Sequence, residues 1–304
     1  MKNRRADGET RGHSDKTLSP RVAASSRLLA SSPSVRRPLI TLLTDFGTLD
    51  YFVSALKGVI LSANPEACIV DITHEIPPQD IEAAAFTLLA ACRSFPAAAI
   101  NVAVVDPGVG SSRRAILIKT RDGFFVGPDN GIFSYVCDHE EDQGATPEIF
   151  HLTNTKYFRH PVSATFNGRD VFAPVAAALS QGVNPGELGT AITEIVRLGP
   201  LRPESLPDGG IKGRIIHIDH FGNCVTNITT GELTAEMIAG GAKLQVNKKW
   251  VSSFRSYFSE EAGSSDKVFG VWGSAGFLEI AALRDSAAKL LKVKRGDVVI
   301  VSES

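Results

Sequence analysis

The strongest constraint on the fold is an alternation of apolar runs with segments of helical periodicity in the first half of the chain. The apolar runs cover residues 39–43, 68–72 and 99–105, and the helical segments between them cover residues 51–63 and 80–93. Strands that are apolar on both faces are typical of parallel strands covered by helices on each side. The alternation therefore predicts an α/β domain with a mostly parallel sheet.

The pattern changes after this region. Short strands are predicted over residues 115–120 and 124–126, followed by a helix over residues 169–180. Residues 199–210 contain three prolines and three glycines, a composition that predicts a linker. Beyond the linker, evenly spaced short strands predict a small barrel or sandwich. These strands cover residues 211–218, 224–228, 243–246, 268–271, 277–281 and 298–301.

We therefore expect a disordered basic extension over residues 1–37, an α/β domain over residues 38–198, a linker over residues 199–210 and a β-barrel domain over residues 211–304. The extension carries nine Lys or Arg against three Asp or Glu and has little hydrophobic periodicity. Such a segment cannot bury enough surface to offset its chain entropy. A transit peptide is the alternative, favoured by the basic, Ser-rich composition and opposed by the early acidic residues.

Composition excludes several classes of protein. The 304 residues are 43% hydrophobic and 21% charged, with a net charge of -1, so we expect neither nucleic acid nor a membrane surface as partner. No segment has the roughly 18 to 20 apolar residues of a membrane span. The four cysteines lie far apart, which predicts buried thiols in a reducing compartment rather than a zinc or redox motif. We predict a soluble cytoplasmic protein without a metal or redox cofactor.

Three acidic residues lie at or just beyond the ends of the first three apolar runs. Asp45 follows the first run, Asp71 lies at the end of the second with His74 close behind, and Asp106 follows the third. Ligands of parallel sheets bind at the carboxyl ends of the strands. A polar site at this edge is the favoured interpretation, and helix caps or turns are the alternative.

Two loops carry further candidate residues. Residues 105–114 end a strand in Asp106 and continue through a Pro-Gly turn, so that Arg113 can fold back towards the carboxylate. The loop lacks the third glycine of a dinucleotide motif, and the chain has no phosphate-loop motif. In residues 165–170, Gly168 allows a bend that could direct Asn167 outward. A surface ion pair and a helix start are the structural alternatives for these two loops.

The C-terminal part offers two more polar loops. Asp219 and Asn223 flank a turn, and a carboxylate with an amide can hold the ammonium and carboxylate of a free amino acid. A metal site with His217 is the weaker interpretation, since no further histidine is suitably placed. Residues 272–279 form a glycine-rich loop open to a flat ligand, in which Phe277 could stack on a base or belong to the core.

Taken together, these segments resemble the S-adenosyl-L-methionine hydrolase (SAM hydroxide adenosyltransferase) family, which is related to the fluorinase and chlorinase that use the same substrate. The resemblance extends from about residue 38 to the C-terminus. Seven segments carry it in the family's order, namely residues 44–47, 71–74, 106–114, 128–131, 165–170, 219–223 and 273–279.

The resemblance implies a fold, a reaction and a set of site residues. The fold would be a larger α/β domain joined to a small β-barrel, assembled as a homotrimer with each site between neighbouring subunits. In the reaction, water attacks the ribose C5′ of S-adenosyl-L-methionine and gives adenosine and L-methionine. Asp45 would hold the ribose hydroxyls, and Asp219 and Asn223 would bind the methionine end. The adenine would meet the loop that contains Ser274, Ala275 and Phe277.

The resemblance also implies a catalytic set of Asp, Arg and His, and this chain departs from it at one position. Asp106 and Arg113 match the first two residues, whereas Asn167 stands where the family has His. Asn cannot take up a proton near neutral pH. A sulfonium leaves as a neutral thioether and needs no general acid, so we expect Asp106 to orient water and Asn167 to bond it.

Two alternative functions follow from the same residues. The first is a halogenase, but the fluorinase has Tyr and Thr where this chain has Asp106 and Val109, which favours hydrolysis. The second is a protein that binds S-adenosyl-L-methionine or adenosine without turnover, which Asn167 would permit.

Overall fold

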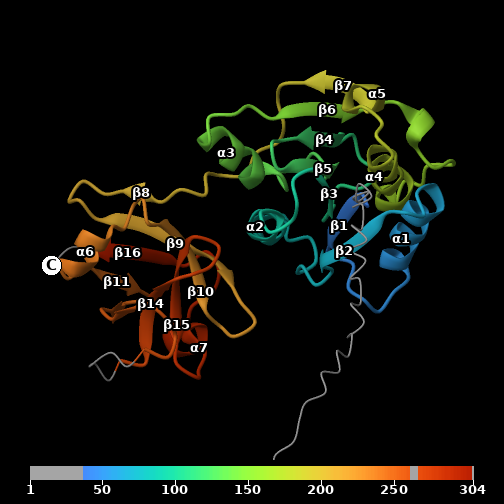
Figure 1. Ribbon diagram of the computed structural model, residues 1–304. Coiled ribbons are helices and arrows are strands. Elements are labelled where there is room, and N and C mark those ends of the chain that lie inside the picture. The colour runs from blue at the N-terminus through green and yellow to red at the C-terminus, as the bar shows by residue number, and fades with distance from the viewer. Residues whose placement is uncertain (1–36, 261–265, 303–304) are drawn as a thin grey trace, which may run out of the picture. The chain divides into compact units, whose positions relative to one another are not determined.

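The computed structural model describes residues 37–260 and 266–302 (Figure 1). The N-terminal part of these residues forms a sheet with the strand order β2-β1-β3-β5-β4-β6-β7. Five of the seven described strands point the same way, and only β4 and β7 oppose them, which confirms the prediction of a mostly parallel sheet. The strands are β1 (Leu39–Thr44), β2 (Cys68–Thr73), β3 (Ala99–Val104), β4 (Ala115–Lys119), β5 (Gly123–Pro128), β6 (Glu148–Leu152) and β7 (Gly189–Ile192).

Helices cover both faces of this sheet (Figure 1). On one face, α1 (Phe52–Ala63) and α4 (Ala173–Ser180) pack in a cluster with Leu42 of β1. On the other face, α2 (Ile81–Cys92) and α3 (Ser134–Asp142) pack in a second cluster with Leu43. Successive residues of a strand point to opposite faces, so β1 is buried on both faces and is apolar apart from the buried Thr41 and Thr44. The continuous apolar run in the sequence has this physical origin.

The first two helices agree closely with the sequence-based expectation. The α2 helix begins where Asp80 caps it, because the carboxylate accepts a hydrogen bond of 3.0 Å from the Ala83 N–H. The helix predicted over residues 169–180 is instead divided. A π-helical turn, η2 (Gly168–Phe172), precedes α4. Hydrophobic periodicity does not distinguish a single wide turn from an α-helical one.

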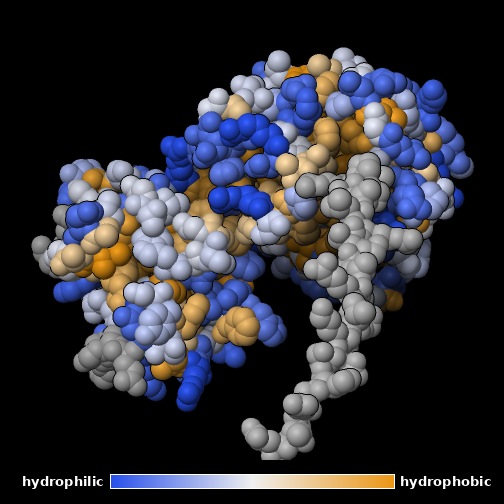
Figure 2. Space-filling model, viewed as in Figure 1, coloured by the Kyte–Doolittle hydropathy of each residue, from blue (hydrophilic) through white to orange (hydrophobic). Residues whose placement is uncertain are grey.

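Helix α3 was not predicted from the sequence. Its buried apolar residues Tyr135, Val136 and Cys137 are consecutive, so they show no helical period. The rest of the helix is acidic, and Figure 2 shows strongly hydrophilic residues gathered over it. Strands β6 and β7 and the short helical elements η1 (Thr155–Tyr157) and α5 (Pro185–Leu188) were also missed.

The C-terminal part is a curled sheet that forms a half-barrel. Its strand order is β12-β11-β16-β9-β10-β15-β14-β13, with β8 paired to β9. The inner face is filled by apolar residues such as Ile215, Ile228, Leu244 and Ile280. The bounds are β8 (Glu204–Ser205), β9 (Ile211–Ile218), β10 (Cys224–Thr229), α6 (Ala235–Ala239), β11 (Lys243–Val246), β12 (Lys249–Val251), β13 (Phe254–Arg255), β14 (Val268–Trp272), β15 (Phe277–Ala282), α7 (Ala287–Leu291) and β16 (Val298–Ser302). This arrangement confirms the expected smaller β domain.

The first turns of α2 contact the half-barrel. Asp80 forms an ion pair of 2.5 Å with Arg295, and Glu82 forms one of 2.6 Å with Arg214. The ring of Phe86 lies 5.2 Å from that of His217. Burial in this contact lowers the pKa of His217, although the charge of Asp219 acts in the opposite direction. Helix α2 is therefore in contact with both the sheet and the half-barrel.

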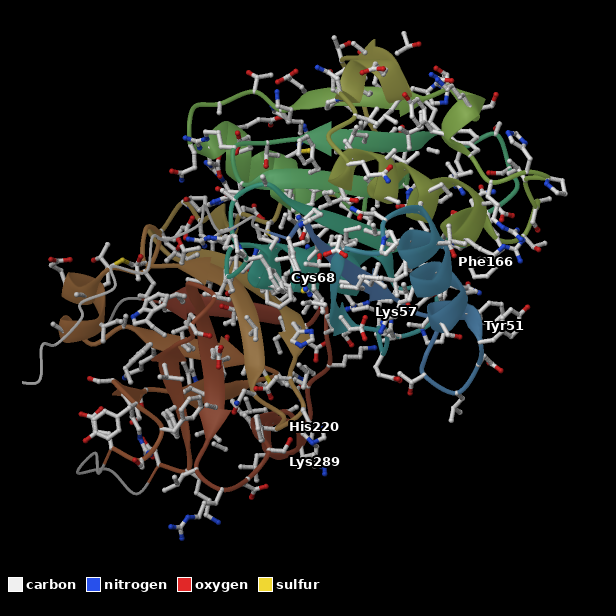
Figure 3. All side chains as sticks on the ribbon, turned by 45° about the vertical axis from the view of Figure 1, so that its right-hand side comes forward. Tyr51, Lys57, Cys68, Phe166, His220 and Lys289 are labelled. Atoms are coloured by element: carbon white, nitrogen blue, oxygen red, sulfur yellow. The ribbon has the colours of Figure 1, made fainter. Side chains whose placement is uncertain are left out.

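The basic extension and its transit-peptide alternative fall outside the described residues. Within residues 37–260 and 266–302, no helix has the length and apolar character to cross a membrane. Cys92, Cys137 and Cys224 are buried as predicted, but Cys68 is exposed because it begins the edge strand β2 (Figure 3).

Candidate active site

The carboxyl ends of β1 and β3 lie side by side because these strands pair in parallel. Asp45 directly follows β1, and Asp106 follows β3 after one intervening residue. The loop after Asp106 passes very close to the segment before η2. Gly110 has a φ of +79°, and a Cβ at this position would lie 2.4 Å from the carbonyl oxygen of Ala164. Only glycine fits there, so this contact brings Asp106 towards Asn167.

Arg113 links Asp106 to Asn167. Its Nε donates to Asp106 Oδ1 at 2.9 Å, and its Nη2 donates both to Asp106 Oδ2 and to Asn167 Oδ1, the latter at 2.6 Å. The side chains of Asp106 and Arg113 are only 5% and 11% exposed. The guanidinium also lies 5.5 Å from the ring centroid of Phe172. The structure thus brings together the three residues that the sequence analysis assigned to catalysis.

Asn167 is oriented by bonds at both ends of its amide. While Oδ1 accepts from Arg113, Nδ2 donates to the carbonyl oxygen of Ser163 at 3.1 Å. An amide has two N–H hydrogens and a carbonyl oxygen with two lone pairs. One hydrogen and one lone pair therefore remain for another group, such as a water molecule.

Asp170 holds the loop that carries Ser163. Its fully buried carboxylate accepts a hydrogen bond of 2.8 Å from the Ser163 N–H and pairs with Arg159 and Arg169. Burial acts to raise the pKa of Asp170, but the hydrogen bonds from Arg169, Ser163 and Arg159 outweigh it and lower the pKa. Asp170 therefore forms ion pairs with two arginines beside the catalytic candidates.

An aromatic cluster connects the residue after Asp45 with the residue before Asn167. Phe46 follows Asp45, Phe166 precedes Asn167, and their ring centroids are 5.9 Å apart. Phe52 contacts both rings, at 5.8 and 5.3 Å. Tyr51 packs on Phe52 and is exposed, and Figure 3 shows Tyr51 and Phe166 beside α1. The sequence analysis missed Phe46 and Phe52, because isolated aromatic residues resemble ordinary core positions.

Asp45 and Asp71 have different surroundings, although both were candidates. Asp45 Oδ2 accepts a hydrogen bond of 2.8 Å from the backbone N–H of Gln79. Asp71 instead forms an ion pair of 2.6 Å with Lys57 of α1. We call four of the described residues the N-terminal site group: Asp45, Asp106, Arg113 and Asn167. Asp71 does not belong to this group.

The turn between β9 and β10 contains the next two candidates. Asp219 accepts two hydrogen bonds from Asn223, one from the backbone N–H and one from Nδ2, both of 2.8 Å. Gly222 has a φ of +86° and lies so close to Ser286 that no Cβ could be accommodated. The turn therefore has a defined shape. Next to it, Phe221 is 75% exposed.

The loop before β15 contains the last three candidates. Gly276 turns the loop with a φ of +89°, and the Gly273 N–H donates to the Phe277 carbonyl at 2.9 Å. Ser274, Ala275 and Phe277 line a cavity of about 1070 Å³ whose other walls include residues of α2 and α3. The Phe277 ring is buried and lies 5.9 Å from Phe86. We call these three residues, with Asp219 and Asn223, the C-terminal site group.

The two groups are not joined within one chain. Among the hydrogen bonds and ion pairs between described residues, none links a member of the N-terminal site group to a member of the C-terminal site group. The described part of the chain also contains no cluster of three or more His, Cys, Asp or Glu side chains suited to a metal ion.

Comparison with known proteins agrees with these features. Models of the N-terminal and C-terminal domains of SAM hydroxide adenosyltransferases match residues 40–189 and 213–300. The (R)-S-adenosyl-L-methionine hydrolase of Methanocaldococcus jannaschii is 40% identical over 266 residues, 84% of this chain and 92% of that protein. The fluorinase of Actinoplanes sp. (strain N902-109) is more distant, at 28% identity over 302 residues, 90% of this chain and all of that protein.

A solved structure shows the same fold. The uncharacterized conserved protein from Thermotoga maritima superposes with a TM-score of 0.79 at 34% identity, covering 87% of this chain and all of that one. The family models together match more than two thirds of the sequence, in the order of the two folded parts. The chain described here therefore belongs to the SAM hydroxide adenosyltransferase family.

Proposed function

We propose that this protein hydrolyses S-adenosyl-L-methionine to adenosine and L-methionine. One observation carries the proposal: a buried Asp106–Arg113 pair with Asn167 bonded to it, in a chain 40% identical to a protein named for this hydrolysis. Water forms a bond from its oxygen to the ribose C5′. The C5′–S bond breaks and its electron pair stays on sulfur, so the positive sulfonium becomes a neutral thioether. The proton of the attacking water is released, which balances the charge.

Asp106 orients the water in this mechanism. Its carboxylate is held by two donors of Arg113, and the remaining lone pairs can accept from water. Holding this water near C5′ and away from solvent increases the rate of attack, because an aligned reactant has already lost the entropy that a free one would lose in the transition state. Asn167 offers the same water its remaining hydrogen or lone pair. No general acid is required, because the leaving group is neutral.

The binding roles belong to both site groups. Asp45 accepts hydrogen bonds from the ribose hydroxyls, and Asp219 pairs with the ammonium of the methionine end. Asn223 supports Asp219 and reaches the methionine carboxylate, and the loop with Ser274, Ala275 and Phe277 meets the adenine. The support for these roles is the orientation of the two carboxylates, each of which is held by a backbone N–H.

We propose a homotrimer in which the N-terminal site group of one subunit faces the C-terminal site group of its neighbour. Large apolar residues beside both groups are exposed, including Leu49, which is 99% exposed, and Phe221. A neighbouring subunit would remove these apolar side chains from water, which favours association. A cytoplasmic location fits the buried free thiols Cys92, Cys137 and Cys224, which persist in reducing compartments.

The proposal is tested by incubating the purified protein with S-adenosyl-L-methionine, with and without chloride, and separating the nucleosides by liquid chromatography. Adenosine should form without chloride, and Asp106→Ala should reduce its rate by about 10²-fold, the effect expected when an aligned reactant is misplaced. Full turnover in Asp106→Ala would refute the assignment.

The same experiment separates the two alternatives. A halogenase would need chloride and would release a halogenated nucleoside. A binding protein without turnover would bind the substrate in calorimetry and leave it intact, and Asn167→His would then restore hydrolysis. Lys119→Ala, which removes an exposed ion pair with Glu148, serves as the control variant.

A further inference from the structure

His74 is a buried residue that the proposed reaction does not use. It directly follows β2 and is buried, and its side chain contacts Thr44 at the end of β1 and Asp71 of β2. Its Nδ1 is 2.9 Å from the hydroxyl of Thr44, the last residue of β1 and the neighbour of Asp45. A buried histidine in contact with the residue before Asp45 can influence how that carboxylate is presented.

The contacts of the His74 ring favour one tautomer. Thr44 Oγ1 accepts a hydrogen bond of 3.2 Å from the Phe46 N–H, so its own proton is available for His74 Nδ1. If Nδ1 accepts, the proton of the neutral ring is on Nε2. Nε2 lies 3.1 Å from Asp71 Oδ1. A carboxylate beside Nε2 favours this tautomer.

Asp71 in turn is held by Lys57. The ammonium of Lys57 donates to Asp71 Oδ2 at 2.6 Å. Partial burial acts to raise the pKa of Asp71, but the contacts with Lys57 and His74 outweigh it and lower the pKa. The carboxylate beside His74 is thus kept charged, and the series from Lys57 through Asp71 and His74 to Thr44 is continuous.

Backbone bonds connect the same two segments. The Gly47 N–H donates to the His74 carbonyl at 2.8 Å, and the Ile76 N–H donates to the Thr44 carbonyl at 3.4 Å. The Gln79 N–H donates to Asp45 Oδ2, as described above, from a residue with a φ of +65°. A non-glycine residue adopts this conformation only when its surroundings require it. Segment 74–79 is therefore hydrogen-bonded to Asp45 and to the chain on both sides of it.

We propose that His74 is a positioning residue: through Thr44 it sets the direction of the Asp45 carboxylate towards the ribose hydroxyls of the substrate. This inference rests on the proposed function, specifically on the contact of Asp45 with the ribose. Without the ring, the Thr44 hydroxyl keeps the Phe46 N–H but loses its contact with Nδ1. The loop after β1 gains freedom, so Asp45 loses its fixed direction. Binding of the methionine end, which uses the other site group, stays the same.

The test compares ligands that differ only in the ribose. The affinities of the full-length protein for adenosine, 2′,3′-dideoxyadenosine and L-methionine are measured by calorimetry. The wild type should bind adenosine about tenfold or more tightly than the dideoxy compound, as expected for hydroxyls bound to a carboxylate. His74→Ala should reduce this preference to less than about threefold, with unchanged affinity for L-methionine. A preference as large as the wild type's in His74→Ala would overturn the inference.

Three further variants test whether a loss of the ribose preference has a merely structural cause. In His74→Asn the amide oxygen occupies the place of Nδ1 and can still accept from Thr44, so this variant should recover most of the ribose preference. Thr44→Val removes the same bond from the other side and should also lose the ribose preference. This variant replaces His74→Ala in the test if the alanine variant does not fold. His151→Ala removes a histidine of β6 outside both site groups and should keep the wild-type preference.

The outcome also distinguishes this inference from the function on which it rests. If the wild type itself does not prefer adenosine over the dideoxy compound, the proposed contact between Asp45 and the ribose is wrong. If the wild type shows the preference and the His74 and Thr44 variants keep it, the proposed function stands and the role of His74 is refuted.

Discussion

The two site groups differ in how completely one chain prepares them. In the N-terminal site group, Asp106, Arg113 and Asn167 are largely buried and bonded to one another across 61 residues of sequence. In the C-terminal site group, Asp219 and Asn223 are bonded within one turn, and exposed Phe221 lies between them. The comparison shows that the N-terminal site group is assembled from segments distant in the sequence, whereas Asp219 and the buried Asn223 are organised by one local turn.

The largest expected effect comes from breaking the buried pair. Arg113→Ala leaves Asp106 as a buried carboxylate without its partner, which costs about 3–5 kcal/mol in other buried ion pairs. We expect a loss of unfolding free energy of this order in urea titration, together with loss of turnover. A loss below about 1 kcal/mol, the level of an exposed ion pair, would show that the N-terminal site group is not organised as described.

The next effect concerns the C-terminal site group. Asp219→Asn keeps the size of the side chain but removes the charge that we propose to pair with the substrate ammonium. Because a hydrogen bond to a charged group contributes about 1.5–3 kcal/mol, KM should rise roughly 10- to 150-fold while kcat changes little. Steady-state kinetics beside an Asp208→Asn control measures this. A fall in kcat with unchanged KM would instead place Asp219 near the reacting atoms.

A smaller effect is expected from restoring the family's histidine. Asn167 does not titrate, so wild-type turnover should be nearly constant between about pH 6 and 8. In Asn167→His the ring must be neutral to accept a proton, so the rate should fall as the pH drops below roughly 6.5, the ordinary pKa of histidine. The pH profile of kcat checks this. A fall in the kcat of the wild type over the same acidic pH range would contradict the prediction.

The smallest effect contrasts the pH dependence of folding in the two regions. The pKa of Asp170 is lowered from 3.8, so its contribution to stability is complete above pH 3.8 and is lost as the pH falls through the folded-state pKa. Burial, with the charge of Asp219, raises the pKa of Glu279, so that carboxylate favours folding when protonated and opposes folding once it ionises.

Two isosteric variants measure this contrast. At pH 7, Asp170→Asn should lower the midpoint of thermal unfolding, and Glu279→Gln should leave it unchanged or raise it slightly. Both differences should shrink as the pH approaches 3. Destabilisation by Glu279→Gln at pH 7 would mean that the ionised Glu279 carboxylate stabilises the fold, which would contradict the prediction.

Much of the fold was predictable because each part has a local signal. The apolar runs predict the bounds of β1, β2 and β3 to within a residue or two of those observed. The cap at Asp80 predicts the start of α2 equally closely. Helix α3 was not predictable, because its buried residues are consecutive and acquire their common face only against α2 and the sheet. The family-based site residues were found from motifs, but motifs carry no distances.

The sequence by itself determined the fold class, the family and the residue types of the site, since strand periodicity, turn glycines and short motifs are local properties of the chain. Only the tertiary structure decided that Arg113 bonds Asp106 and Asn167 at once, that Asp71 pairs with Lys57 outside the N-terminal site group, and that His74 contacts the residue before Asp45. Each of these contacts joins residues separated in sequence, and their relative positions follow from strand pairing and loop packing, which no local pattern encodes.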